Sequence, residues 1–156
     1  MFNPDVGNGY MTAMAVSLAE YLAGWLYCGG RAPGWLTCVG LLMALAGQAL
    51  RTLAMVTAGT SFNHYVATKR AADHELVTCG VYAVERHPSY VGFFLWAVGL
   101  QLMLSNLVSA GLFAAVLGYF FVRRTRREEQ FLLRFFGRQY QEYRDRTSTL
   151  IPGVGR

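Results

Sequence analysis

The sequence predicts an all-α integral membrane protein with about four transmembrane helices, and the distribution of its charges carries that prediction. Of its 156 residues, 54% are hydrophobic and 15% are charged, whereas soluble domains carry about 25% charged residues. The 33 residues 90–122 contain no Asp, Glu, Lys or Arg. A helix crosses the bilayer core with about 20 apolar residues, so this run is typical of membrane spans. The composition excludes a disordered chain, and three scattered cysteines exclude a disulfide scaffold.

The first two spans are expected to form a helical hairpin. The first covers residues 10–28 and is interrupted only by Glu20, and the second covers 35–58 with Arg51 inside it. The glycines and proline within 29–34 predict a tight turn between them. An ionisable group inside a span is costly and therefore a functional candidate, but we favour structural roles for both charged residues.

The charge-free run predicts a second hairpin. As one helix it would be about 50 Å long, which exceeds a hydrocarbon core of about 30 Å. We therefore expect one span over 90–104 and another over 107–122, with a turn at Ser105-Asn106. The whole chain, 1–156, is then a single membrane domain.

Two polar segments, 59–89 and 123–156, connect or follow these spans. Because two crossings separate them, both segments lie on the same side of the membrane. The second segment holds nine of the fourteen basic side chains against four acidic ones, and the positive-inside rule then predicts that both face the cytosol. A basic tail is also compatible with nucleic-acid binding, but the apolar remainder of the chain argues against a nucleic-acid partner.

Aromatic and leucine side chains recur at helical spacing from Phe131 to Tyr143, with arginines between them. This pattern predicts a C-terminal amphipathic helix that lies in the membrane interface with its apolar face down. Packing of the same face on the polar segment 59–89 is equally compatible with the sequence.

Three histidines in the first polar segment, His64, His74 and His87, raise the question of a metal site. They are ten and thirteen residues apart, no second ligand stands three or four residues from any of them, and the HExxH pattern does not occur. We expect no metal.

Charged residues at the membrane ends of the third and fourth spans are candidates for a binding site. Proline disfavours helix at the residue before it, so Pro88 defines the start of a span with Arg86 and His87 at the membrane surface. If helix continues past the fourth span, Arg124 and Glu128 share one face. Either segment alone is explained by a capped helix or by solvated charges. Together, two cations and a carboxylate suit a ligand with a carboxylate at one end and a cationic amine elsewhere.

At this point an ordered set of motifs resembles the isoprenylcysteine carboxyl methyltransferases over roughly residues 35–154. One motif, RHPxYxG, also occurs in related membrane methyltransferases, but the ordered set is specific. The motifs are Thr57-Ala58-Gly59-Thr60-Ser61-Phe62-Asn63-His64, His74-Glu75-Leu76-Val77-Thr78-Cys79-Gly80-Val81-Tyr82, Arg86-His87-Pro88-Ser89-Tyr90-Val91-Gly92, Arg124-Thr125 with Glu128-Glu129, Phe136-Gly137-Arg138-Gln139-Tyr140, and Ile151-Pro152-Gly153.

The resemblance implies S-adenosylmethionine as cofactor and assigns residues to it. Glu128 is expected to bind the cofactor's amino group. Arg124 is expected to hold the substrate carboxylate with Arg86 assisting, which makes these two arginines the catalytic candidates. The remaining cofactor-binding candidates are His74, Leu76, Val77, Tyr82, His87, Pro88, Ser89 and Tyr90.

The implied reaction transfers a methyl group to the C-terminal carboxylate of an S-farnesyl or S-geranylgeranyl cysteine in processed CaaX proteins. The prenyl chain would enter from membrane lipid, in the endoplasmic reticulum, with the active site facing the cytosol. A terminal carboxyl has a pKa of about 3.5, so no general base is needed. Two alternatives stay open: a membrane methyltransferase acting on a lipid or small molecule, and a non-enzymatic transport or assembly subunit.

Overall fold

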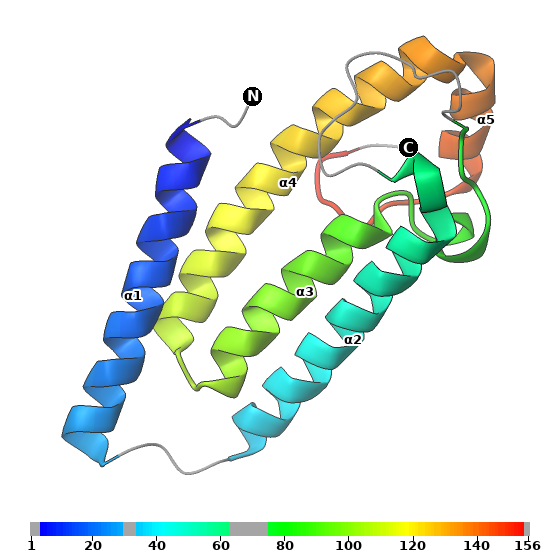
Figure 1. Cartoon of the computed structure of the whole chain (residues 1–156). Helices are drawn as coiled ribbons and strands as arrows, with labels where there is room; N and C mark the ends of the chain where they lie inside the picture. Colours follow the sequence, from blue (N-terminus) through cyan, green and yellow to red (C-terminus); the bar gives the residue numbers. More distant parts are fainter. Residues whose placement is uncertain (1–3, 30–33, 63–74, 155–156) are drawn as a thin grey trace. The chain divides into compact units, whose positions relative to one another are not determined.

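The computed structural model describes residues 4–29, 34–62 and 75–154, and within these ranges every regular element is a helix (Figure 1). The all-helical class is therefore confirmed for the described residues. The α-helices are α1 (Pro4–Cys28), α2 (Trp35–Ala58), α3 (Pro88–Met103), α4 (Leu107–Phe136) and α5 (Arg138–Arg146), and the short 3-10 helices are η1 (Gly59–Ser61) and η2 (Gly80–Ala83).

α2 has the predicted bounds and α3 lies within two residues of them, whereas α1 begins six residues before the predicted span and α4 continues 14 residues beyond it. α3 begins at Pro88, as expected for a proline whose fixed backbone suits a first helical turn. The predicted turn between α3 and α4 is present, and Ser105 adopts a left-handed φ of 57° there. Among the described residues, the range Trp35–Ser61 and α4 are long and apolar enough to cross a bilayer, whereas α3 is a shorter apolar helix of 16 residues.

The chain divides into two compact units, one within 1–48 and 92–120 and the other within 49–91 and 121–156. In the first unit, Glu20 of α1 caps the start of α4. Its carboxylate accepts hydrogen bonds from the backbone N–H groups of Val108 (3.2 Å) and Ser109 (2.8 Å) and from the Ser109 hydroxyl (2.7 Å). The first N–H groups of a helix have no acceptor within it, and a negative charge is favourable at this end of the helix dipole. Glu20 thus has the structural role that we favoured.

Glycines bring α2 and α3 close together in the same unit. A Cβ atom on Gly99 would lie 2.6 Å from the backbone nitrogen of Ala44 and 2.9 Å from the carbonyl oxygen of Gly40. A Cβ atom on Gly47 would likewise lie 2.5 Å from the backbone nitrogen of Trp96. Small residues let helix backbones approach closely where no hydrophobic effect drives association, so these glycines set the helix separation.

Replacing Gly99 with alanine is expected to destabilise the protein by about 1–3 kcal/mol, because the added methyl group meets backbone atoms that cannot move aside. Thermal unfolding of the purified protein in detergent measures the effect. Gly118→Ala is the matched control, because a Cβ at that helical position meets nothing within 4 Å. The control should be neutral or slightly stabilising, and equal melting temperatures for both variants would contradict the assigned packing role.

In the second unit, the predicted amphipathic helix across 131–143 is wrong as one continuous helix. α4 ends at Phe136, and Gly137, with a φ of 51°, turns the chain into α5. Glycine adopts this left-handed conformation without the steric cost that a Cβ imposes. Tyr140 and Tyr143 of α5 are buried, and the Tyr143 hydroxyl donates to the Tyr82 carbonyl oxygen at 2.7 Å. Of the two placements left open, these contacts agree with packing on the polar segment.

Candidate active site

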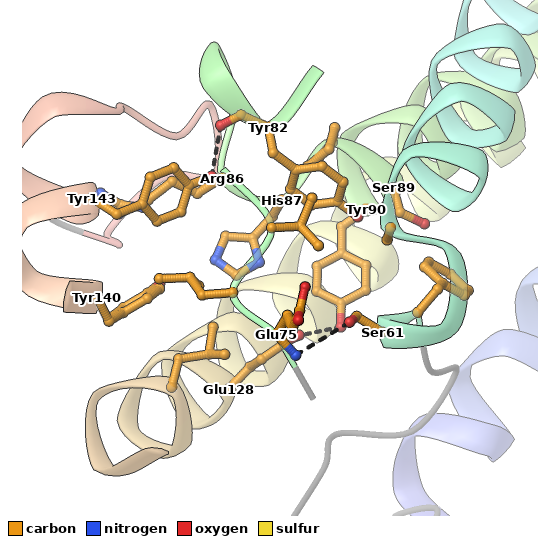
Figure 2. Close-up of a pocket in the computed structure, with 16 residues that line it drawn as sticks. Ser61, Glu75, Tyr82, Arg86, His87, Ser89, Tyr90, Glu128, Tyr140 and Tyr143 are labelled. Carbon is orange, nitrogen blue, oxygen red and sulfur yellow. Dashed lines mark hydrogen bonds between the residues drawn. The ribbon is translucent and has the colours of Figure 1, made fainter. Parts of the chain in front are cut away.

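An open pocket with a cavity volume of about 110 Å³ lies within the second unit (Figure 2). Its lining residues come from the end of α2, η1, the extended segment before η2, the start of α3, one face of α4, and α5. They are Ala58, Ser61, Phe62, Glu75, Leu76, Val77, Tyr82, Arg86, His87, Pro88, Ser89, Tyr90, Glu128, Leu132, Tyr140 and Tyr143.

The structure brings most of the predicted site residues together around this pocket. Of the nine cofactor-binding candidates, His74 lies outside the described residues, and the other eight all line the pocket. Arg86 lines it as well. The pocket also has lining residues that share a helix face: Leu132 lies four residues after Glu128 on α4, and Tyr140 and Tyr143 are three apart on α5.

The Tyr90 hydroxyl joins the two charged residues of α4 that the sequence placed on one face. It donates to Glu128 Oε2 at 2.5 Å and accepts from Arg124 Nε at 2.8 Å. The Arg124 guanidinium also lies over the Tyr90 ring, 5.2 Å from its centre, in a cation–π contact. In the part of the chain that the structure describes, Arg124 does not line the pocket itself. It is connected to the pocket through Tyr90.

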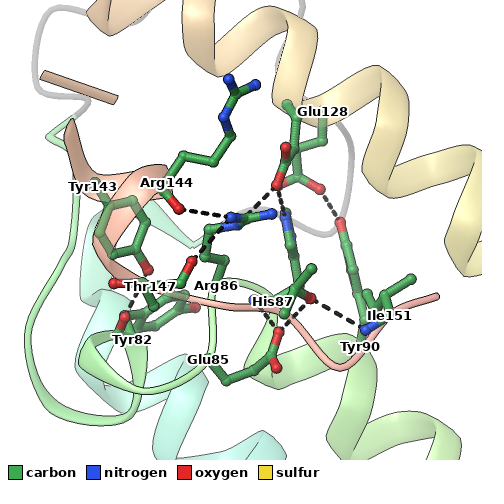
Figure 3. Close-up of polar contacts among 12 residues, drawn as sticks. Tyr82, Glu85, Arg86, His87, Tyr90, Glu128, Tyr143, Arg144, Thr147 and Ile151 are labelled. Carbon is green, nitrogen blue, oxygen red and sulfur yellow. Dashed lines mark hydrogen bonds and ion pairs between the residues drawn. The ribbon is translucent and has the colours of Figure 1, made fainter. Parts of the chain in front are cut away.

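Arg86 has different surroundings from Arg124, although the sequence assigned them a shared role. Its side chain is 1% exposed, and Nε lies 3.0 Å from Glu129 Oε1 in an ion pair. Its Nη1 donates to the carbonyl oxygens of Arg144 at 3.1 Å and Thr147 at 2.9 Å (Figure 3). The Nε2 atom of His87 lies 3.1 Å from the same Glu129 oxygen. Arg86 is therefore a fixed, buried cation, held by Glu129 and two backbone carbonyls.

Three tyrosines give the pocket neutral aromatic walls. Burial raises the pKa of Tyr82 to about 12, and the negative charge of Glu128 adds to the effect. Burial also raises the pKa of Tyr140 and that of Tyr143 above the ordinary value for a phenol. All three phenols therefore stay protonated at neutral pH, where they serve as apolar surfaces and hydrogen-bond donors and not as bases.

Several site residues were not predicted from the sequence. The helical spacing that runs through Tyr140 and Tyr143 was visible, but not which surface it covers. Glu129 was not distinguishable from its neighbour Glu128, because the sequence does not specify which partner each of two adjacent carboxylates on a helix faces. Glu85, which is buried beside the pocket and contacts the C-terminal segment, carried no sequence signal.

The comparison with known proteins decides the family. The model of the isoprenylcysteine carboxyl methyltransferase family matches residues 39–134. This chain belongs to that family. It is 44% identical over 150 residues to protein-S-isoprenylcysteine O-methyltransferase B of Arabidopsis thaliana, covering 96% of this chain and 76% of the relative. It is 56% identical over 106 residues to protein-S-isoprenylcysteine O-methyltransferase of Schizosaccharomyces pombe, covering 68% of this chain and 45% of the relative.

A solved structure of the eukaryotic intramembrane Ras methyltransferase, isoprenylcysteine carboxyl methyltransferase, has the same fold. The TM-score is 0.88 at 38% sequence identity, and the match covers 99% of this chain and 54% of that one. This chain thus spans about half the length of the solved relative. Family membership makes the chain a methyltransferase of membrane character, which requires a methyl donor.

Proposed function

We propose that this protein transfers the methyl group of S-adenosylmethionine to the C-terminal carboxylate of an S-prenylated cysteine. The observation that carries the proposal is the arrangement around Tyr90. A carboxylate that lines the pocket, Glu128, lies on one side of the hydroxyl, and the Arg124 guanidinium lies on the other. Glu128 suits a cationic methyl donor, and Arg124 suits an anionic methyl acceptor. The relatives of this chain are named for methylating isoprenylcysteine.

The residues of the pocket fit S-adenosylmethionine. Glu128 supplies the negative charge that its ammonium group requires. The neutral aromatic ring of Tyr82, which is partly exposed, offers a surface on which a purine can lie, and the buried rings of Tyr140 and Tyr143 lie behind the pocket wall. Bound there, the cofactor supplies an electrophilic methyl group.

The protein's task in this reaction is to hold the acceptor in place. The acceptor carboxyl, with an ordinary pKa of about 3.5, is ionised at neutral pH, so no residue has to remove a proton. We assign Arg124 to bind the carboxylate. Arg86, fixed by Glu129, adds positive potential from the pocket wall. Correct alignment of two reactants can supply up to about 7–11 kcal/mol.

The membrane arrangement belongs to the same proposal. Four spans, α1 to α4, would place both polar segments, 59–89 and 123–156, on the cytosolic side. We assign the protein to the endoplasmic reticulum, with the prenyl chain of the substrate remaining in membrane lipid. The cofactor would then reach the pocket from the cytosol.

A methyl-transfer assay with a matched pair of variants tests the proposal. Purified protein is incubated with labelled S-adenosylmethionine and S-farnesylcysteine, and base-labile methyl ester is counted, while cofactor affinity is measured separately by calorimetry. Glu128→Ala should weaken cofactor binding about 10- to 100-fold, because a charged hydrogen-bond acceptor is lost. Glu142→Ala, which changes an exposed carboxylate on α5, should behave as the wild type. Cofactor binding without ester formation would exclude prenylcysteine as the acceptor.

A further inference from the structure

Glu85 is a buried carboxylate directly before the pocket-lining residues 86–90. It is 7% exposed and, among the residues that the structure describes, it does not line the pocket. Its Oε1 accepts from the His87 backbone N–H at 3.0 Å and from the Thr149 hydroxyl at 2.6 Å, and its Oε2 accepts from the Leu150 backbone N–H at 2.7 Å (Figure 3). One side chain thus joins the pocket wall to the C-terminal segment.

We call residues 147–154 the C-terminal strap. Its backbone is also bonded to Arg86: the Arg86 N–H donates to the Ser148 carbonyl oxygen at 3.3 Å, and Arg86 Nη1 donates to that of Thr147 at 2.9 Å. Farther along, the Gly153 carbonyl oxygen accepts from Arg126 Nη2 at 3.0 Å. Hydrogen bonds therefore hold the C-terminal strap along most of its length, and its Thr147 carbonyl oxygen is one of the acceptors around the Arg86 guanidinium.

We propose that Glu85 is a positioning residue for methyl-donor binding, acting by fastening the C-terminal strap to the backbone that carries His87. The inference rests on the proposed function, because it concerns the same pocket. Release of the strap would remove a carbonyl that holds Arg86 and a bond that fixes the start of α3. His87, Pro88, Ser89 and Tyr90 would then lose their defined position around the pocket.

The contacts explain why a carboxylate stands at this position. A carboxylate only accepts hydrogen bonds, and its two oxygens can accept several. Three N–H and O–H donors point at it from two parts of the chain. An amide of the same shape would direct an NH₂ group at one of those donors, so at least one of the three bonds would be lost.

Glu85→Gln tests the role of the carboxylate with almost no change in shape. Cofactor affinity, measured by calorimetry with S-adenosylmethionine on folded protein, should fall about tenfold, in line with the loss of one charge-assisted hydrogen bond. Glu142→Gln, an exposed carboxylate on α5, is the matched control and should keep the wild-type affinity. A folded Glu85→Gln protein with wild-type affinity would overturn the inference.

Changes at Thr149 separate positioning from general stability and serve if Glu85→Gln does not fold. Thr149→Val should weaken cofactor binding about 2- to 10-fold, whereas Thr149→Ser keeps the hydroxyl and should restore the affinity. The double variant Glu85→Ala/Thr149→Val should bind no more weakly than Glu85→Ala, because removal of the carboxylate already breaks its bond to Thr149.

The outcomes distinguish this inference from the proposed function. Additive losses in the double variant, or equal affinities for Thr149→Val and Thr149→Ser, would overturn the positioning role alone. Wild-type protein that binds no S-adenosylmethionine would overturn the proposed function and this inference with it.

Discussion

Replacing Arg124 with alanine is expected to lower methyl transfer about 100- to 1,000-fold while cofactor affinity stays close to that of the wild type. This is the usual loss of rate when one preorganised hydrogen-bond donor is removed from a site where charge changes in the transition state. Arg124 contacts the pocket through the Tyr90 hydroxyl and ring and does not line it among the described residues. Its loss therefore removes the cation that we propose binds the substrate carboxylate and leaves the walls of the cofactor pocket in place.

Single-turnover methyl transfer at saturating cofactor, combined with calorimetric cofactor binding, measures the two effects separately. Arg124→Lys should recover only part of the rate, because an ammonium group lacks the planar fork that binds a carboxylate through two bonds. Arg138→Ala is the control, since that arginine side chain is 92% exposed and pairs with Glu142 on the surface. If Arg124→Ala lost cofactor affinity and turnover in equal measure, the residue would support the pocket and not the substrate.

Much of the fold was predictable because strong local signals mark its breaks. The end of α1, the start of α2 and both ends of α3 were predictable from the glycines within 29–34, the proline at 88 and a charge-free run too long for one crossing. Residues 30–33 of the predicted turn lie outside the described residues. The break at Gly137 was missed, because the apolar spacing continues on both sides of it. Only the backbone conformation, with a φ of 51°, shows where α4 ends.

The candidate site was predictable where neighbours on one helix determine it. Four-residue spacing was enough to place Arg124 and Glu128 on the same side of α4, and both contact Tyr90. Contacts between distant segments were not predictable. The pairing of Arg86 with Glu129, 43 residues later, depends on how α4 is rotated against the start of α3, which charge patterns do not specify.

Replacing Glu129 with alanine is expected to destabilise the protein by about 3–5 kcal/mol, the usual cost of leaving a buried charge without its partner. Arg86 is 1% exposed at its side chain and Glu129 is 9% exposed, so water cannot take the place of the carboxylate. His87 would lose its contact to the same oxygen. Chemical denaturation of the purified protein measures the change, with Glu142→Ala as the control for loss of an exposed carboxylate. Wild-type stability would mean that Glu129 does not neutralise Arg86.

A double replacement separates what the ion pair contributes to stability from what it contributes to the reaction. Apolar residues of similar size in place of a buried ion pair are often neutral or stabilising, so Arg86→Met/Glu129→Met should regain most of the stability that Glu129→Ala loses. Its methyl transfer should stay below that of the wild type, because the fixed cation in the pocket wall is gone. Full activity in the double variant would show that Arg86 serves the fold alone and would leave Arg124 to bind the acceptor carboxylate unaided. The buried pair would then be kept for packing and not for chemistry.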